Sequence, residues 1–322
     1  MFTVQIIKLD NVRNLEHAAE LLERSQILDE TVDDEEWPTH EPLTKRWNAA
    51  PYFDPGINEI TAGTRENIRV MFAEGYNERY KRKESWYDDE DGGDELVPKE
   101  NRINISKYNS IFFEYDDNVY VAPIMPLTGP LSTYIGDLLP EEIWGVHTKE
   151  PNDYKMSKDF FYWLLNIFTR KNKLVASDPQ IRIRSWTGFH GMTQDTIHKL
   201  SGEGDQISAI LGTLAFLFMD DPFKSLNVSI QFKNERIPVV LWATGSLTID
   251  DALYEGIFAN GFFHEKQKVL LAVLLYTQVL PELFKAYTSD KKSDKWNEKI
   301  KEDFRNYIGD QIISRVKSEL QI

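Results

Sequence analysis

The feature that most constrains this fold is the stretch of residues 226–250, which predicts two β-strands and the turn between them. Apolar and polar residues alternate from Leu226 to Lys233, so one face of the first strand should be buried and the other polar. The turn is expected at residues 233–235. The continuous apolar run at 237–242 predicts a second strand that is central in its sheet and buried on both faces. A long apolar helix follows, so we expect this hairpin to be the structural centre of the chain.

Hairpins and long apolar helices alternate along the chain without a regular βαβ order, which predicts an α+β fold. The sheet should be mixed or antiparallel, and the carboxy terminus should be helical. Helical spacing of apolar residues predicts helices at 15–28, 135–144, 158–169, 193–200, 207–219 and 265–281, and in a last helix that reaches residue 320. Strands are predicted at 2–9, 110–115, 119–123 and 180–189. The expected helix caps are Asp10 or Asn11, Ser157, and Ser293 or Asp294.

Several segments give weaker patterns. Residues 29–55 hold an acidic run and four prolines and are expected to be irregular. Residues 58–70 fit either a strand with a turn at 62–63 or a short helix that begins near Thr64. A basic cluster at 79–83 precedes an acidic, glycine-containing run and could pair with it, and we expect a disordered loop at 88–97. Residues 201–205 predict a turn.

Charge divides the chain into two regions. The net charge is −15, and residues 1–150 hold 15 Lys and Arg against 31 Asp and Glu, whereas residues 151–322 hold 22 against 21. The excess acid of the first region repels nucleic acid and favours a basic partner. We place a boundary near Glu150, between an acidic α+β region at 1–150 and an α+β core region with carboxy-terminal helices at 151–322.

The composition excludes several classes of protein. The chain contains no cysteine, which excludes disulfides, thiolate zinc sites and a cysteine nucleophile. The first ten residues lack the basic segment and cleavage site of a signal peptide. The most apolar run, at 269–276, is far below the roughly 20 residues that a membrane span needs. We therefore expect a cytoplasmic protein without membrane insertion.

The last helix carries the clearest interaction signal. Six apolar residues recur at every fourth position from Ile300 to Leu320. This stripe predicts packing onto the body of the protein, and a partner-helix interface is the alternative. Together with the acidic region, it leads us to expect a binding or regulatory subunit that acts through protein–protein contacts and needs no cofactor. Self-association stays open.

Motifs of common enzymes are absent from the sequence. There is no P-loop and no Gly-x-Ser-x-Gly elbow. The absence of housekeeping motifs also suggests the hypothesis of a role in microbial antiviral (anti-phage) defence.

A metal-dependent nuclease is the competing hypothesis. Such enzymes pair an acid with a Glu/Gln-x-Lys strand, so that carboxylates hold a divalent ion and the lysine helps to activate water. Asp221, followed by Gln231 and Lys233 on a strand, imitates that pattern. Glutamine is a poorer ligand than glutamate, however, and a solvated strand face explains Gln231 and Lys233 equally well. Magnesium or manganese would be required only under this hypothesis.

A second candidate metal site is the sequence His190-x4-Asp195-x2-His198. Histidine and carboxylate together can hold zinc or manganese. Asp195 and His198 would share a face of the predicted helix at 193–200, and His190 could approach from the preceding loop. The alternative is that both histidines are surface residues.

Nucleic-acid binding without cleavage is a third hypothesis. Arg182, Arg184 and Trp186 place cations and an aromatic ring on one predicted strand. Such interleaving can bind phosphates and stack bases. It is equally typical of a sheet edge that is covered by an acidic loop.

Overall fold

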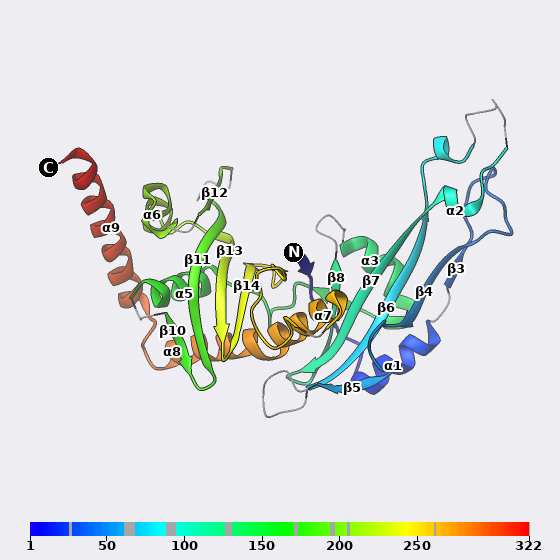
Figure 1. The fold of residues 1–322 in the computed structure, drawn as a ribbon, viewed down its shortest axis with the longest axis horizontal. Helices are drawn as coiled ribbons and strands as arrows, with labels where there is room; N and C mark the ends of the chain where they lie inside the picture. The colour runs from blue at the N-terminus through cyan, green and yellow to red at the C-terminus, as the bar shows by residue number, and fades with distance from the viewer. Residues whose placement is uncertain are drawn as a thin grey trace. The chain divides into compact units, whose positions relative to one another are not determined.

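The computed structural model describes residues 1–25, 28–60, 68–87, 95–125, 131–170, 173–193, 197–204, 207–260 and 262–321. Their contacts divide the chain into two compact units. The amino-terminal unit is Gln5–Lys149, and the carboxy-terminal unit joins Met1–Val4 to Glu150–Ile322. Each unit is built from antiparallel strands and helices (Figure 1), so the predicted α+β class is confirmed.

The amino-terminal unit is an antiparallel sheet with helices on one face. Its strands are, in spatial order, β3 (Leu28–Glu30), β4 (Leu43–Ala49), β6 (Ile68–Tyr80), β7 (Ile103–Tyr115), β8 (Asn118–Met125), β2 (Ile7–Leu9) and β9 (His147–Lys149), and β5 (Ile57–Ile60) pairs with the start of β6. Helices α1 (Leu15–Arg24), α3 (Leu131–Leu138) and α4 (Glu141–Trp144) share one apolar core with the strands. A 3-10 helix, η1 (Lys83–Ser85), and α2 (Lys99–Arg102) lie in the connection from β6 to β7.

The predicted hairpin of β7 and β8 is confirmed. Its two-residue turn consists of Asp116 and Asp117, which have φ angles of +48° and +59°. Positive φ at both central residues is the geometry of a type I′ turn, which matches the twist of the flanking strands. Aspartate tolerates this left-handed conformation better than most residues.

Three predictions for this unit are wrong. Residues 29–55 are not all irregular, because β3 includes residues 29 and 30, and β4 lies between Pro42 and Pro51 and joins the sheet through β6. The predicted strand at 2–9 is two strands, β1 (Phe2–Val4) and β2, which belong to different units. Helix α1 is capped by Asn14, whose Oδ1 accepts a hydrogen bond from the His17 amide at 2.9 Å, and not by Asp10 or Asn11.

Residues 57–60 and 68–80 form the antiparallel pair β5–β6, in agreement with the strand alternative. The turn at 62–63 and the helix start at Thr64 lie outside the described residues. Arg79 of the basic cluster binds Asp137 at 2.5 Å, and Lys83 lies 2.7 Å from Glu36. The acidic run at 88–94, and with it most of the expected loop at 88–97, also lies outside the described residues.

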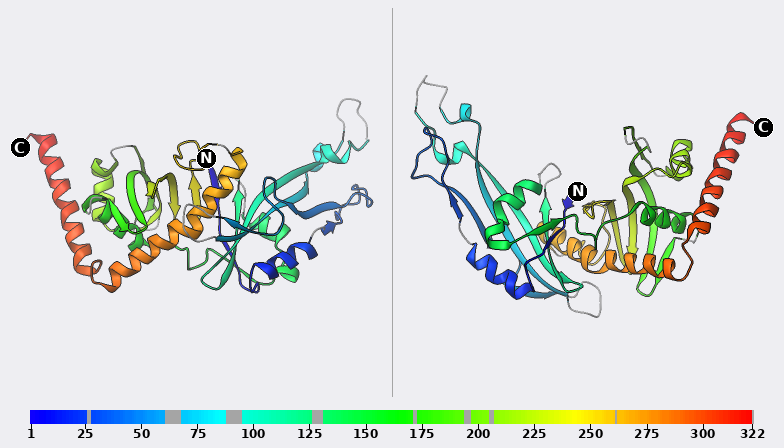
Figure 2. Two further views of the ribbon diagram at one scale, coloured as in Figure 1. Left: turned by 60° about the horizontal axis from the view of Figure 1, so that its bottom comes forward. Right: turned by 180° about the vertical axis from the view of Figure 1, so that it is seen from behind.

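The carboxy-terminal unit has the predicted hairpin in the middle of its sheet. The strands are, in spatial order, β10 (Leu174–Ser177), β11 (Gln180–Met192), β13 (Phe223–Phe232), β14 (Glu235–Trp242), β15 (Leu247–Ile249) and β1, and β12 (Lys199–Glu203) pairs with the second half of β11. The helices are α5 (Lys158–Arg170), the 3-10 helix η2 (Ile207–Ala209), α6 (Leu211–Phe218), α7 (His264–Leu274), α8 (Leu280–Lys292) and α9 (Glu298–Leu320). Helix α5 covers one face of this sheet (Figure 2).

The hairpin of β13 and β14 is confirmed, with a two-residue turn at Lys233 and Asn234. Buried side chains of the two strands face each other, as Val228 does Val239. The predicted burial of β14 on both faces is wrong. Its side chains alternate, and Val240 and Trp242 are partly exposed. The apolar run therefore predicted correctly that β14 is a central strand, but it did not predict that one face of the strand is partly exposed.

Helix α5 matches its prediction, and the Ser157 hydroxyl accepts a hydrogen bond from the Phe160 amide at 3.1 Å. The helix predicted at 193–200 and the turn predicted at 201–205 are wrong where the structure describes them. Residues 199–203 form strand β12 and pair with Gly188–Met192. Sequence periodicity did not predict this strand because β12 is short and exposed, so its residues do not alternate between apolar and polar.

Helices α7 and α8 form one continuous rod through the π-helical segment Leu275–Val279. Pro281 lacks an N–H group and its ring would collide with the carbonyl four residues earlier, so the preceding turn widens. Accordingly, the Leu280 amide bonds to the Leu275 carbonyl five residues back. By length and composition alone, His264–Lys292 could cross a membrane, but 61% of its apolar window is buried inside the protein. Core helices of soluble proteins pass the same test.

Helix α9 begins later than predicted. Ser293 ends α8, and the cap of α9 is Asn297, whose Oδ1 accepts a hydrogen bond from the Ile300 amide at 3.0 Å. The apolar stripe is also not straight. A helix turns by about 100° per residue, so each four-residue step overshoots a full turn by about 40°. Phe304 is 2% exposed, whereas Leu320 is 63% exposed. The predicted packing onto the body therefore holds only for the first half of α9.

Substitution of the α9 cap should loosen the first turn of that helix. We expect N297A to cost about 1 kcal/mol of helix stability. Amide exchange at Ile300 should then be about fivefold faster. S293A is the matched control, because Ser293 lies outside α9, and it should leave this exchange rate unchanged. Equal exchange rates in the two variants, measured by hydrogen–deuterium exchange, would contradict the assignment of the cap.

Candidate binding site at helix α9

One carboxylate holds the start of α9 against the carboxy-terminal unit. Asp159, in the first turn of α5, lies 2.6 Å from the Lys301 ammonium group and accepts a hydrogen bond from Trp296 Nε1 at 3.2 Å. It also accepts a hydrogen bond from the Tyr287 hydroxyl. Because these partners come from α8, from α9 and from the turn between them, a single side chain joins three helices.

Asp159 is held in its ionised form. Burial raises the pKa of its carboxyl group, but the hydrogen bonds from Lys301 and Tyr287 outweigh burial and bring the pKa below its ordinary value. Burial lowers the pKa of Lys301, and its hydrogen bonds to Asp159 and Glu298 overcome that effect and raise it. A negative charge in the first turn of α5 is also favoured by the helix dipole.

A second contact fixes the middle of α9. Helices α6 and α9 pack together, and a Cβ atom on Gly309 would lie 3.1 Å from the Phe218 ring. Asp220, just after α6, lies 2.6 Å from Lys158 and 3.6 Å from Arg305. The cavity of about 640 Å³ beside these residues is lined largely by charged groups that already pair with one another. We therefore assign this cavity a structural role.

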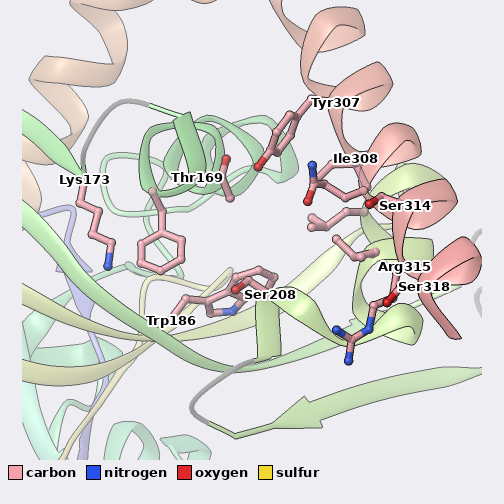
Figure 3. A pocket seen from close by; sticks show the side chains of 13 residues that line it. Thr169, Lys173, Trp186, Ser208, Tyr307, Ile308, Ser314, Arg315 and Ser318 are labelled. Atoms are coloured by element: carbon pink, nitrogen blue, oxygen red, sulfur yellow. The ribbon is translucent and has the colours of Figure 1, made fainter. Parts of the chain in front are cut away.

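A different cavity, of about 580 Å³, lies between α5, α6, α9 and β11 (Figure 3). We call it the α9 cavity. Its lining consists of apolar and aromatic residues together with hydroxyl, amide and cationic groups: Phe168, Thr169, Lys173, Trp186, Ser208, Leu214, Leu217, Tyr307, Ile308, Gln311, Ser314, Arg315 and Ser318. No carboxylate occurs among these residues. A volume of this size is typical of sites for small ligands.

The other side of α9 is apolar and faces solvent. Ile313, Val316 and Leu320 are 55%, 37% and 63% exposed, and the partly exposed ring of Phe218 lies beside Gly309 on the same side of the helix. We call Phe218, Ile313, Val316 and Leu320 the outer α9 surface. Contiguous exposed apolar side chains are uncommon on monomeric proteins and often mark an interaction site.

The structure does not bring the proposed nuclease residues together. Asp221 precedes β13, whereas Gln231 and Lys233 lie at its opposite end. At about 3.3 Å per residue, the two ends of this ten-residue strand are roughly 30 Å apart. Gln231 also donates a hydrogen bond to the Lys233 carbonyl at 2.6 Å and accepts one from Arg184. These three residues therefore cannot hold one metal ion.

The candidate metal ligands are only partly described. His190 lies on β11, where its Nδ1 is 3.1 Å from the Ser225 hydroxyl. His198 lies just before β12 and three residues before Ser201, which is the partner of His190 in the sheet. Asp195 lies outside the described residues. Within the part of the chain that the structure describes, no group of three or more histidine or acidic side chains could hold a metal ion.

The arginines and the tryptophan proposed to bind nucleic acid lie on opposite faces of the sheet. Arg182 and Arg184 lie on the face that carries Gln231, which accepts a hydrogen bond from Arg184 at 3.3 Å. Trp186 is 2% exposed on the core face and lines the α9 cavity. Sequence reasoning missed Trp242, which lies on the arginine face and stacks on His190 with ring centroids 6.0 Å apart.

The residues of α9 that line the cavity were also missed. Their signal was present as a polar stripe, with Tyr307, Gln311, Ser314, Arg315 and Ser318 spaced as i, i+4, i+7, i+8 and i+11. Gln311, Ser314, Arg315 and Ser318 are exposed, so this stripe has the pattern of any solvent face and does not by itself identify a cavity wall.

Loss of the Asp159 charge should release α9 in a pH-dependent way. At pH 7 we expect D159N to lower the free energy of unfolding of the carboxy-terminal unit by about 2 kcal/mol. Because the folded-state pKa of Asp159 is below the unfolded value, its contribution is present above the unfolded pKa of about 3.9 and is lost as the pH falls through the folded value. The difference between wild type and D159N should therefore shrink below about pH 4.

E298Q is the control for this experiment, because Glu298 contacts the same Lys301 but is 90% exposed. We expect a change below about 0.5 kcal/mol. Urea denaturation across the pH range, followed by tryptophan fluorescence, measures both variants. A difference between wild type and D159N that stays constant down to pH 2 would contradict the assigned role of the charge.

Comparison of the sequence with known proteins does not indicate a function. No protein-family model matches the chain, and no curated protein matches its sequence. Its function therefore has to be argued from the geometry of the described residues.

Proposed function

We propose that this chain is a binding subunit that docks an apolar helix of a partner protein on the outer α9 surface. One observation carries the proposal. The second half of α9 turns Ile313, Val316 and Leu320 toward solvent, while the inner side of the same helix faces the α9 cavity. A helix end that served only to pack on its own protein would place these side chains inward.

The spacing of the exposed residues supports a helix as the partner element. Ile313, Val316 and Leu320 are separated by three and four residues, which is the repeat by which two helices interlock. Full burial of an aliphatic side chain is worth about 1.5 to 3 kcal/mol. Three such side chains could thus supply several kcal/mol to a complex, which is enough to form the centre of an interface.

The charged residues beside the exposed apolar residues do not favour a partner of either charge. Asp310 and Lys317 lie on one flank of Ile313, and Arg305 and Glu319 lie on the other. Apolar complementarity should therefore dominate at this surface. The excess acid of residues 1–150 supports a partner that also carries a basic surface, because opposite net charge accelerates encounter.

Two acidic substitutions on the outer α9 surface should abolish the complex. In I313E/V316E, two carboxylates would be buried against an apolar partner, so we expect binding to weaken at least about a hundredfold. The tagged chain is purified from its native cells, co-purifying proteins are identified by mass spectrometry with their stoichiometry, and the affinity of the identified partner is measured by calorimetry.

K317E is the matched control, because it adds a negative charge on the exposed flank without touching the apolar stripe. It should retain the partner. Both variants should keep their melting temperature within about 2 °C, because the altered side chains are exposed. Retention of the same partner by I313E/V316E would overturn the proposal. A wild-type dimer in light scattering that I313E/V316E dissolves would identify the partner as a second copy of the chain.

A second candidate function, single-stranded nucleic-acid binding, is supported by one specific observation. Arg182, Arg184 and Arg236 share one face of the carboxy-terminal sheet with the stacked rings of His190 and Trp242. Cations beside exposed aromatic rings are the usual platform for single strands. Arg236 is already paired with Glu255 at 2.8 Å, which reduces the free positive charge.

Salt dependence tests this second function. If the face binds an oligonucleotide, removing two phosphate contacts in R182A/R184A should reduce the slope of log K against log salt by about 1.4. Fluorescence anisotropy with a labelled 20-mer of single-stranded DNA or RNA measures the slope. K149A, in the amino-terminal unit, is the charge control. Absence of binding at low salt would remove this candidate and leave the protein-binding proposal untouched.

A further inference from the structure

The inner side of α9 is unusual for a helix face that is turned toward its own protein. Four of the five α9 side chains that approach the cavity from the polar stripe are uncharged, and the fifth is Arg315. Trp186 lies across the cavity from α9 (Figure 3), and Phe168 and Leu214 also belong to the lining. Gln311, Ser314, Arg315 and Ser318 are exposed to solvent, whereas Trp186 and Leu214 are buried. The cavity is therefore an open cleft, with one wall that can form hydrogen bonds with a ligand and one wall that is apolar.

The polar groups at the cavity retain free hydrogen-bonding capacity. The hydroxyl groups of Ser208, Ser314 and Ser318 and the amide of Gln311 form no hydrogen bond with any residue that the structure describes. By contrast, the Thr169 hydroxyl donates to the Leu165 carbonyl at 2.9 Å. Several donors therefore point into one space of about 580 Å³ without a protein partner among the described residues.

The charge of the lining has one sign. Lys173 and Arg315 lie on opposite sides of the cavity, with Trp186 and Ser208 between them (Figure 3), and no acidic residue belongs to the lining. Lys173 uses one of its three donors on the Arg184 carbonyl at 3.2 Å. Arg315 meets Glu319 at 3.5 Å, an exposed pair one turn apart on α9. Exposed pairs of this kind are weak, so the guanidinium group can readily exchange its partner for a ligand.

We propose that the α9 cavity binds a small amphiphile, a molecule that combines a flat apolar or aromatic part with an anionic head group. The apolar part packs against the edge-to-face pair of Phe168 and Trp186, whose ring centroids lie 6.4 Å apart, and the free hydroxyl groups and Arg315 receive the head group. Charge-assisted hydrogen bonds from a guanidinium group to a carboxylate, sulfonate or phosphate are among the strongest in proteins. This inference does not depend on the proposed function, because the outer α9 surface lies on the other side of the helix.

The test uses the full chain and the aromatic sulfonate 1-anilinonaphthalene-8-sulfonate. We expect one molecule to bind per chain, with a fluorescence increase and a blue shift. K173Q/R315Q should weaken this binding about tenfold, equivalent to roughly 1.4 kcal/mol. The neutral analogue N-phenyl-1-naphthylamine has the same ring system without the sulfonate, and its affinity should change less than about twofold in that variant.

Two further variants distinguish this cavity from other apolar surfaces. S314W places an indole in the cavity and should abolish binding of both probes. I313S/V316S alters only the outer α9 surface and should leave both affinities unchanged. Unchanged sulfonate affinity in K173Q/R315Q, or loss of binding in I313S/V316S, would overturn the proposal. If S314W fails to fold, K173Q/R315Q, I313S/V316S and the neutral probe still test the proposal. Both double variants should fold, because the residues that they change are exposed.

Discussion

The carboxylate of Asp159 determines the position of α9, and every candidate site in the carboxy-terminal unit depends on that helix. Its contacts with Lys301, Trp296 and Tyr287 join α5, α8 and the start of α9. Partial burial of a charge costs free energy, and the charge stabilises the fold only where its partners offset that cost. Beyond this junction, α9 contacts the unit mainly through α6, so its second half is held by fewer contacts than its first.

Helix geometry then determines what each side of α9 presents. A repeat of four residues drifts against a period of 3.6, so the apolar stripe passes from the inner to the outer side within the length of this one helix. The place vacated on the inner side is taken by polar residues, including Ser314 and Arg315. The outer apolar surface and the inner polar cavity are therefore two consequences of one pattern. Neither would exist if the apolar residues followed a period of 3.6.

The sequence predicted the elements whose burial is one-sided and strong, and it failed where burial was slight. Alternation along β13 and the cap at Ser157 identified a strand and a helix correctly, because their apolar faces meet a core. Strand β12 is exposed and left no periodic signal. Of the candidate site, the α9 stripe was found, but its rotation was not considered. The polar lining was missed because a hydrophilic helix face that lines an open cleft is still exposed to solvent, so its sequence pattern is that of any solvent face.

The two sides of α9 also bear on how the proposed ligand and the proposed partner would affect each other. Ser314 and Arg315 face the cavity, whereas Ile313 and Val316, their immediate neighbours in sequence, face outward. Two sites are coupled only when each ligand binds more tightly to one position of a shared element. The second half of α9 is that shared element, because it lies between both sites and beyond the Asp159 junction. A shift of this segment that tightens the cavity also moves the outer stripe. By linkage, an amphiphile that strengthens partner binding must then itself be bound more tightly, by the same factor, when the partner is present.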